Sequence, residues 1–370
     1  MGNDYKSLEE QYTNTRLLIG LKSNGRLKEL NSILQCLGHI KILANYTKYK
    51  FDNVEDIKIY KSYHKTEKCL TDSFKSIIEK IWPKDVKGKV GEALKTVKKV
   101  EESKEFMEMV YSINPNYNEN QEFLFDFIIL RLHQELNKVQ NQKKQVETKI
   151  LPNQGEALKN YYENVITQNQ SKISDHFFGT NYTLILCCGC QKYLYKFTGF
   201  INFYYSLDLV SNYKLTTCRL GNNPLYINKI PNFYEVNIYD CLLFSQQIIN
   251  CFQTCTNCKY MTYNYIKNAI YASPIILTII FNRNVYLPNI CFSIEEQIDI
   301  SQFVEYKVNT KYELIGIIYS TNINHFIAFS KNPIDKKWYC YDDDKVEVKN
   351  NFYEICATNT IPYTLFYQRA

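Results

Sequence analysis

The chain has 370 residues, of which 45% are hydrophobic and 22% are charged, so it can bury a large core and is not disordered by composition. Its formal net charge of +6 is mild for this length, and no long basic run is present, which speaks against a nucleic-acid-binding protein. The first residues lack the apolar core of a secretory signal, and no apolar stretch reaches the roughly 18 residues of a membrane span. We therefore expect no nucleic acid and no membrane among its partners. The 13 cysteines then indicate a reducing compartment, cytoplasmic or nuclear, where cysteines are thiols or metal ligands.

The region from about residue 16 to 165 is predicted to be helical. After a Gly-containing loop, Leu30, Ile33, Leu34 and Leu37 recur at the spacing of an amphipathic helix. Cys36 in this helix is expected to be a small buried residue. The polar segment 137–153, rich in Gln and Lys, is interpreted as an insertion between helices.

The region 176–275 contains short aromatic and β-branched runs, which predict strands and turns. It also holds two C-x-x-C pairs, Cys187 with Cys190 and Cys255 with Cys258. Two such pairs, each presented by a tight turn, predict a tetrahedral four-thiolate site for one structural zinc ion. Because 64 residues separate the pairs, the alternative that these are buried thiols without a metal stays open.

The region 275–370 is dominated by strand signals, with residues 274–281 and 312–318 as candidates for buried strands. His325 follows the second of these, and Asp342 lies in the stretch that begins at Trp338. Taken alone, a histidine on an apolar strand can also be structural.

Residues 20–37 resemble the signature G-L-x-N-L-G-N-T-C-Y-M-N-S-x-L-Q-x-L of the ubiquitin-specific protease family. Further blocks that resemble this family follow in the family's order, at residues 118–124, 171–179, 240–244, 274–279, 324–329, 338–346 and 362–369. The resemblance implies an α+β, papain-like cysteine protease fold of the ubiquitin-specific protease type. After an N-terminal extension, 1–15, it implies a single domain, 16–369, with a helical thumb (about 16–165), zinc-ribbon fingers (176–275) and a β-rich palm (275–369).

The same resemblance implies roles for individual residues. His325 stands at the position of the general base and Asp342 at that of the acid that orients it. Aligned without a gap, Lys28 stands where the family has its catalytic cysteine, and Ser23 where it has the asparagine that serves the oxyanion. Glu119 stands where the family has the aspartate that helps to hold the ubiquitin tail. Taken alone, Glu119 can equally be an acid near a helix N-terminus that complements the helix dipole.

The departures around the nucleophile position decide the functional hypothesis. A lysine at the start of a helix faces the positive end of the helix dipole, and its reference pKa of about 10.4 is far too high for a nucleophile. Arg26 and Glu29 also differ from the signature. The leading hypothesis is a catalytically impaired pseudo-deubiquitinase that binds ubiquitin, a ubiquitin-like protein or ubiquitinated partners. The alternatives are an active deubiquitinating thiol protease that uses another cysteine, and a scaffold without affinity for ubiquitin.

Overall fold

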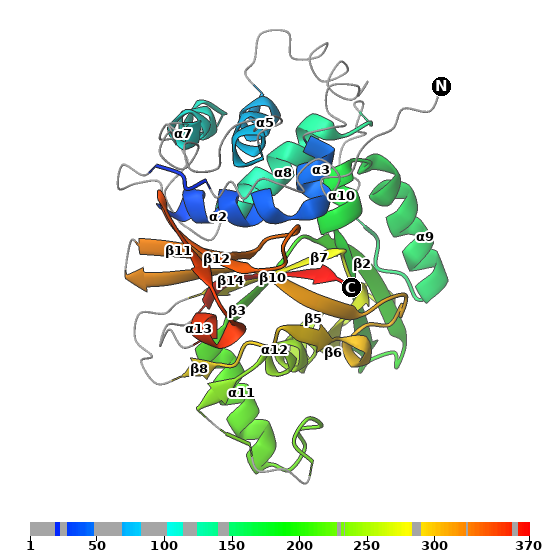
Figure 1. The fold of residues 1–370 in the computed structure, drawn as a ribbon. Coiled ribbons are helices and arrows are strands. Elements are labelled where there is room, and N and C mark those ends of the chain that lie inside the picture. The colour runs from blue at the N-terminus through cyan, green and yellow to red at the C-terminus, as the bar shows by residue number, and fades with distance from the viewer. Residues whose placement is uncertain are drawn as a thin grey trace, which may run out of the picture. The chain divides into compact units, whose positions relative to one another are not determined.

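The structure is a computed structural model, and it describes residues 19–22, 28–47, 69–82, 102–113, 124–139, 148–227, 231–232, 234–282, 290–322, 325–356 and 362–370 (Figure 1). The chain forms two compact units, which are described separately. The first unit comprises the described residues within Met1–Asn137 and Leu314–Phe366, and the second those within Lys138–Glu313 and Tyr367–Ala370.

The described helices of the N-terminal part belong to the first unit: α2 (Lys28–His39), α3 (Lys41–Asn45), α5 (Leu70–Ile81), α7 (Glu102–Ile113) and α8 (Leu124–Leu136). The apolar positions that predicted the first of these helices are buried, and α2 contacts α5 as well as β11 of the sheet described next. A buried carboxylate on α8 caps α5. Glu135 accepts from the N–H of Leu70 at 3.1 Å and that of Thr71 at 2.8 Å, while Arg131 Nε lies 2.7 Å from it. Glu135 thus satisfies donors that the first turn of a helix cannot pair internally.

The C-terminal strands of the first unit form a sheet in the order β13-β12-β11-β10-β14. These are β10 (Lys311–Asn322), β11 (His325–Lys331), β12 (Trp338–Asp342), β13 (Lys345–Lys349) and β14 (Pro362–Arg369), with the short helix α13 (Phe352–Cys356) before the last strand. The predicted strand at residues 312–318 is therefore confirmed as part of β10. Helix α2 packs along β11 and β12, as Figure 1 shows.

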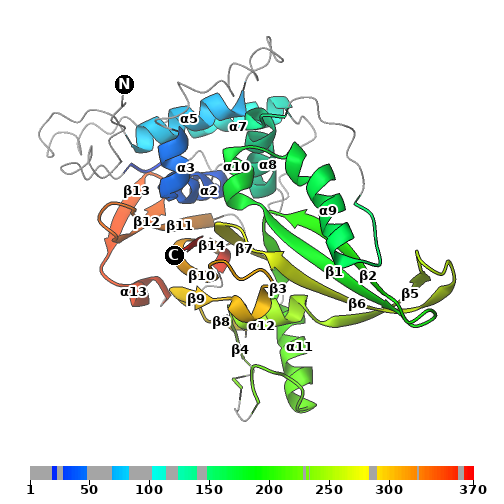
Figure 2. The same cartoon turned by 90° about the vertical axis from the view of Figure 1, so that its right-hand side faces the viewer.

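The second unit contains a four-stranded antiparallel sheet in the order β2-β1-β6-β5 (Figure 2). Its strands are β1 (Gly179–Cys187), β2 (Tyr193–Phe200), β5 (Ile248–Thr254) and β6 (Met261–Ala272). Helix α9 (Gln154–Asn164) covers β2, where Tyr161 packs on Phe197 with ring centroids 6.3 Å apart. The remaining elements are η4 (Ile166–Gln168), α10 (Lys172–Phe177), β3 (Phe203–Ser206) parallel to β7 (Ile276–Asn282), β4 (Glu235–Val236) parallel to β8 (Cys291–Phe292), β9 (Gln297–Asp299) and η5 (Ser301–Phe303).

Two helices interrupt the region in which the sequence predicted only strands and turns. These are α11 (Leu207–Arg219) and α12 (Ile238–Ser245), which pack on each other. Lys214 of α11 is buried against Asp240 of α12, with Nζ 3.0 Å from Oδ2, and the Tyr226 hydroxyl donates to the same carboxylate at 3.0 Å. The aromatic and threonine-rich composition favoured strands, but this buried lysine, which donates to the Asp240 carboxylate and to the Glu235 carbonyl, stabilises the helical packing instead. The prediction of a buried strand at residues 274–281 is confirmed by β7.

Candidate active site and metal site

A histidine and an aspartate meet at the ends of two neighbouring strands of the first unit. His325 is the first residue of β11 and Asp342 the last residue of β12, which pairs antiparallel with it. Nε2 of His325 lies 2.8 Å from Oδ1 of Asp342, and 29% and 34% of the two side chains are exposed. Because a carboxylate only accepts hydrogen bonds, Nε2 is the donor in this contact, and the neutral imidazole then has its lone pair on Nδ1. Such an imidazole can take a proton from an acid placed beside Nδ1.

Hydrogen bonds join the turn that follows Asp342 to the segment that precedes α2 and to α2 itself. The Leu21 N–H donates to the Asp343 carbonyl at 2.9 Å, and Nδ2 of Asn31 on α2 donates to Asp343 Oδ1 at 3.0 Å and to the Leu21 carbonyl at 3.2 Å. A Cβ on Gly20 would lie 2.6 Å from the Asp343 carbonyl oxygen, so this approach requires glycine. Asn31 therefore connects the first turn of α2 to the hairpin that carries Asp342.

Helix α2 begins at Lys28, the position that the family resemblance assigns to the nucleophile. Its first turn offers N–H groups without intrahelical partners, which favour an anion over an ammonium group. The Lys28 side chain lies outside the described residues, as do Ser23 and Glu119. The roles assigned to these three residues, and the catalytic roles of His325 and Asp342, stay predictions.

The cysteines of the first unit are poorly suited to replace a nucleophile. Cys36 is buried, as predicted, and Ser330 Oγ lies 3.6 Å from its Sγ. Burial raises the pKa of Cys36 to about 12. Burial likewise raises the pKa of Cys69 to about 12 and that of Cys340 to about 11. The remaining cysteine of this unit, Cys356, is exposed at the end of α13. A reactive thiolate needs a lowered pKa, and the thiols of Cys36, Cys69 and Cys340 have raised ones.

Glu29, the second residue of α2, is a partly buried carboxyl group in the same unit. The Tyr363 hydroxyl donates to its Oε1 at 3.3 Å, and the Tyr363 ring packs on Phe326, the neighbour of His325, at 5.2 Å between centroids. Burial raises the pKa of Glu29 from 4.5 to about 8, and the bond from Tyr363 offsets only part of this rise. Glu29 is therefore largely protonated at neutral pH, directly after the nucleophile position.

We expect Glu29 to make the stability of the protein fall as the pH rises. The folded state keeps the proton up to about pH 8, whereas the unfolded chain loses it near pH 4.5, so the free energy of unfolding decreases between these two values. Glu29→Gln should flatten this decrease and stabilise the protein at pH 8 by about 1–3 kcal/mol, as measured by urea unfolding at pH 5 and pH 8. Glu156→Gln removes an exposed carboxylate from the first turn of α9 and is the control. If both variants keep the pH slope of the unaltered protein, the assignment is wrong.

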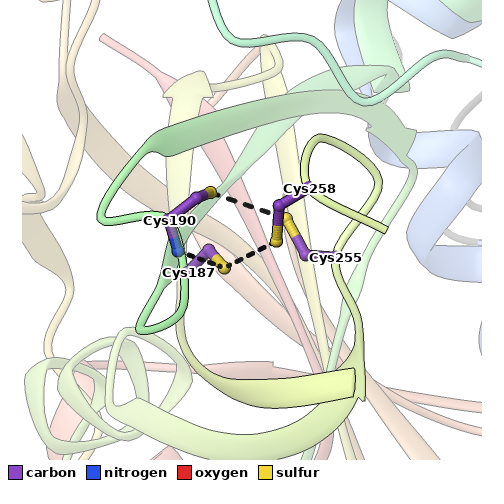
Figure 3. A group of neighbouring side chains, drawn as sticks. All are labelled: Cys187, Cys190, Cys255 and Cys258. Atoms are coloured by element: carbon purple, nitrogen blue, oxygen red, sulfur yellow. Dashed lines mark hydrogen bonds between the residues drawn. The ribbon is translucent and has the colours of Figure 1, made fainter. Parts of the chain in front are cut away.

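Four cysteines from two turns converge in the second unit. Cys187 and Cys190 flank the turn between β1 and β2, and Cys255 and Cys258 lie in the turn between β5 and β6. All four sulfur atoms lie within 4.8 Å of one another, with 3.9 Å between Cys187 and Cys258 and 4.0 Å between Cys190 and Cys255 (Figure 3). Zn–S bonds of about 2.3 Å in a tetrahedron place the sulfur atoms about 3.8 Å apart. The four thiols therefore fit a single tetrahedral metal ion, as their spacing predicted.

The two turns repeat one backbone geometry. The Gln191 N–H donates to the Cys187 carbonyl at 2.8 Å, and the Lys259 N–H donates to the Cys255 carbonyl at 2.9 Å. Gln191 and Lys259 each directly follow the second cysteine of a pair, and both have positive φ, 56° and 64°. A backbone N–H two residues further on lowers the pKa of Cys190 to about 6. The backbone thus presents both pairs in the same way and stabilises a thiolate, the form that binds metal.

The family model "Ubiquitin carboxyl-terminal hydrolase" matches residues 19–367. The chain belongs to this family. Ubiquitin carboxyl-terminal hydrolase 2 of Rattus norvegicus is 23% identical over 376 residues, which cover 95% of this chain and 54% of that protein. Ubiquitin carboxyl-terminal hydrolase Usp2 of Drosophila melanogaster is 23% identical over 374 residues, covering 95% of this chain and 35% of that protein. The chain thus spans about half of the first relative and about a third of the second.

Solved structures of the family show the same fold. A chain of the SAGA deubiquitinating module with Ubp8 bound to monoubiquitin is 18% identical, with a TM-score of 0.62 over 97% of this chain and 72% of that chain. A chain of the yeast SAGA deubiquitinating module is also 18% identical, with a TM-score of 0.60 over 95% of this chain and 68% of that chain. The predicted α+β fold of the ubiquitin-specific protease type is confirmed.

Sequence reasoning did not predict the residues whose side-chain hydrogen bonds position the elements of the site. Asn31 and Gln35 are buried polar residues one turn apart on α2, and Gln35 Nε2 donates to the Ile19 carbonyl at 2.8 Å. Buried polar side chains on an apolar helix were the available signal, because such groups need hydrogen-bond partners. The sequence could not name Asp343 as the partner of Asn31.

Among the described helices, none combines the length and the apolar character that crossing a membrane requires.

Proposed function

We propose that this ubiquitin carboxyl-terminal hydrolase-family domain is a pseudo-deubiquitinase that binds ubiquitin, or a ubiquitin-like or ubiquitinated partner, without hydrolysing it. The observation that carries the proposal is the start of α2. The chain places Lys28 and then Glu29 where a thiol protease of this family has its nucleophile and the following aromatic residue. The neighbouring His325–Asp342 contact is intact, at 2.8 Å. A base without a nucleophile cannot form the covalent acyl-enzyme of a cysteine protease.

Ubiquitin as the ligand is supported by the relatives. Solved structures that share this fold are bound to monoubiquitin in one case and to ubiquitin aldehyde in another. Glu119 supplies an acid at the position that the family resemblance assigns to the ubiquitin tail. We also propose that Cys187, Cys190, Cys255 and Cys258 hold one zinc ion, which would supply no catalysis and would cross-link the two turns. Thiolate ligands stay reduced in the cytoplasm or nucleus, where we place the protein.

The test measures binding and hydrolysis on the same preparation. We expect monoubiquitin to bind in isothermal titration calorimetry, and a ubiquitin C-terminal fluorogenic amide to remain uncleaved. Glu119→Lys should weaken binding by about tenfold or more, because it reverses the charge offered to the tail. Glu156→Lys, at an exposed position of α9, is the matched control. Hydrolysis that depends on one cysteine contradicts the pseudoenzyme, and absence of binding to any ubiquitin form favours the scaffold.

The intact His325–Asp342 pair favours one second candidate, an active thiol protease that uses another cysteine. The raised pKa values of the Cys36, Cys69 and Cys340 thiols speak against it. A ubiquitin probe with a C-terminal electrophile decides between the two, because it labels only an activated thiol. We expect no labelling of the unaltered chain.

A further inference from the structure

Strand β5 forms an open edge of the four-stranded sheet. It is the last strand in the order β2-β1-β6-β5, and no described segment pairs with its outer side (Figure 2). Its sequence, Ile-Ile-Asn-Cys-Phe-Gln-Thr, contains neither proline nor a charged residue. It pairs with β6 in register over all seven residues, from Ile248 opposite Lys267 to Thr254 opposite Met261, without a bulge. Prolines, charges and bulges are the devices that normally keep an edge strand from pairing with another chain. β5 has none of them.

The hydrogen-bond pattern shows which backbone groups of β5 face outward. The Cys255 N–H donates to the Tyr260 carbonyl at 2.9 Å, which fixes the alternation along the hairpin. In an antiparallel pair, every second residue exchanges its bonds with the partner strand and the residues between turn theirs away. Cys251 therefore bonds to β6, while Ile248, Asn250, Phe252 and Thr254 offer their N–H and C=O groups to the outside.

The same alternate residues also carry exposed apolar side chains. Ile248 is 65% exposed and Phe252 56% exposed. On β6, Tyr263 lies opposite Phe252 and Tyr265 opposite Asn250, so both exposed tyrosines are on the same face, and the rings of Phe252 and Tyr263 are 5.0 Å apart. A contiguous exposed apolar surface beside an open edge indicates an interaction site.

We propose that β5 pairs antiparallel with β5 of a second copy of this chain, with the two-fold axis at Cys251. Only this register overlaps all seven residues of both strands. It brings Asn250 opposite the partner's Phe252, and Ile248 opposite the partner's Thr254, and these are the residues with outward-facing backbone groups. Because β5 is uncharged, two identical strands do not repel each other. The axis stands perpendicular to the sheet, so the two aromatic faces continue on one side of an eight-stranded sheet.

The oligomeric state tests the proposal. Short edge pairing buries less than a standard interface, so we expect a dimer with a dissociation constant on the order of 10–100 µM, measured by sedimentation equilibrium of the whole chain. Asn250→Pro removes only an outward N–H, which an edge strand tolerates, and Phe252→Lys places a charge beside the two-fold axis. Each should weaken the dimer at least about tenfold. Tyr193→Lys is the matched control, because Tyr193 is 52% exposed on the same face but on β2, the opposite edge strand.

Cross-linking tests the register. At the axis the two copies of Cys251 face each other as a pair, with Cβ atoms about 5 Å apart. A short bismaleimide should therefore link two copies, and Cys251→Ser should abolish that link. A chain that is monomeric at about 200 µM, a dimer that survives both Asn250→Pro and Phe252→Lys, or a cross-link that survives Cys251→Ser overturns the proposal.

Discussion

Replacing Lys28 by Cys is expected to make the chain react with a ubiquitin probe that carries a C-terminal electrophile, whereas the unaltered chain stays unlabelled. The new thiol would begin α2, where the N–H groups of the first turn favour a thiolate. Helix α2 packs against β11, which starts with His325, so a base lies on the neighbouring element. We expect turnover of a ubiquitin amide to stay low, because Ser23 is shorter than the asparagine that the family resemblance assigns to the oxyanion position. Adding Ser23→Asn should then raise the rate by about 10²–10³-fold, the usual worth of one oxyanion donor.

Two controls separate an activated thiol from a merely exposed one. Lys41→Cys puts a cysteine at the first residue of α3, another helix start, and should not be labelled by the probe. His325→Ala in the Lys28→Cys background should reduce labelling, because it removes the base. Equal labelling of the Lys28 and Lys41 variants would mean that the reaction needs no catalytic pair. If folded Lys28→Cys variants do not react with the probe, the site no longer accepts the ubiquitin C-terminus, and this result favours the scaffold hypothesis.

The sequence predicted those parts of the site that depend on local motifs, and it did not predict those that depend on contacts between residues far apart in the chain. His325 and Asp342 lie 17 positions apart on neighbouring strands, and the family resemblance of the two blocks that contain them assigned both to one site. The bond between Asn31 and Asp343 joins residues 312 positions apart, and no periodicity encodes it. The raised pKa of Glu29 likewise depends on what β14 and β11 bury around it. Sequence reasoning thus predicted the His325–Asp342 pair and missed the groups that position it.

The metal site follows the same division. Each C-x-x-C turn is local, and both turns adopt the geometry that their spacing indicated. Their meeting is not local, because Cys187 and Cys258 are 71 positions apart and converge only through the antiparallel order of β1 and β6. The sequence did not predict helix α11 for a related reason. Its Lys214 side chain can be buried because its ammonium group donates hydrogen bonds to Asp240 of a later helix and to the Glu235 carbonyl.

Zinc removal is expected to have the second large effect. The purified protein should contain about one zinc ion per chain, measured by mass spectrometry of metals in protein prepared without chelator. Cys190→Ser or Cys258→Ser should lose the ion and lower the Tm of the protein by about 10 °C or more, because binding free energy at a structural site is folding free energy. A strong chelator should lower the Tm of the unaltered protein to a similar value and leave these variants unchanged.

Cys188→Ser is the control that makes this test specific. Cys188 lies in the same turn, between the two cysteines of the first pair, yet it is outside the group of four converging thiols. Its replacement should therefore keep the zinc content and the Tm. Zinc is expected to stabilise the protein because it cross-links the two turns. Strands β1 and β6 pair along their length, but the ladder between them does not extend into the turns. Zinc-free protein with an unchanged Tm would show that the four thiols hold the turns together by packing alone.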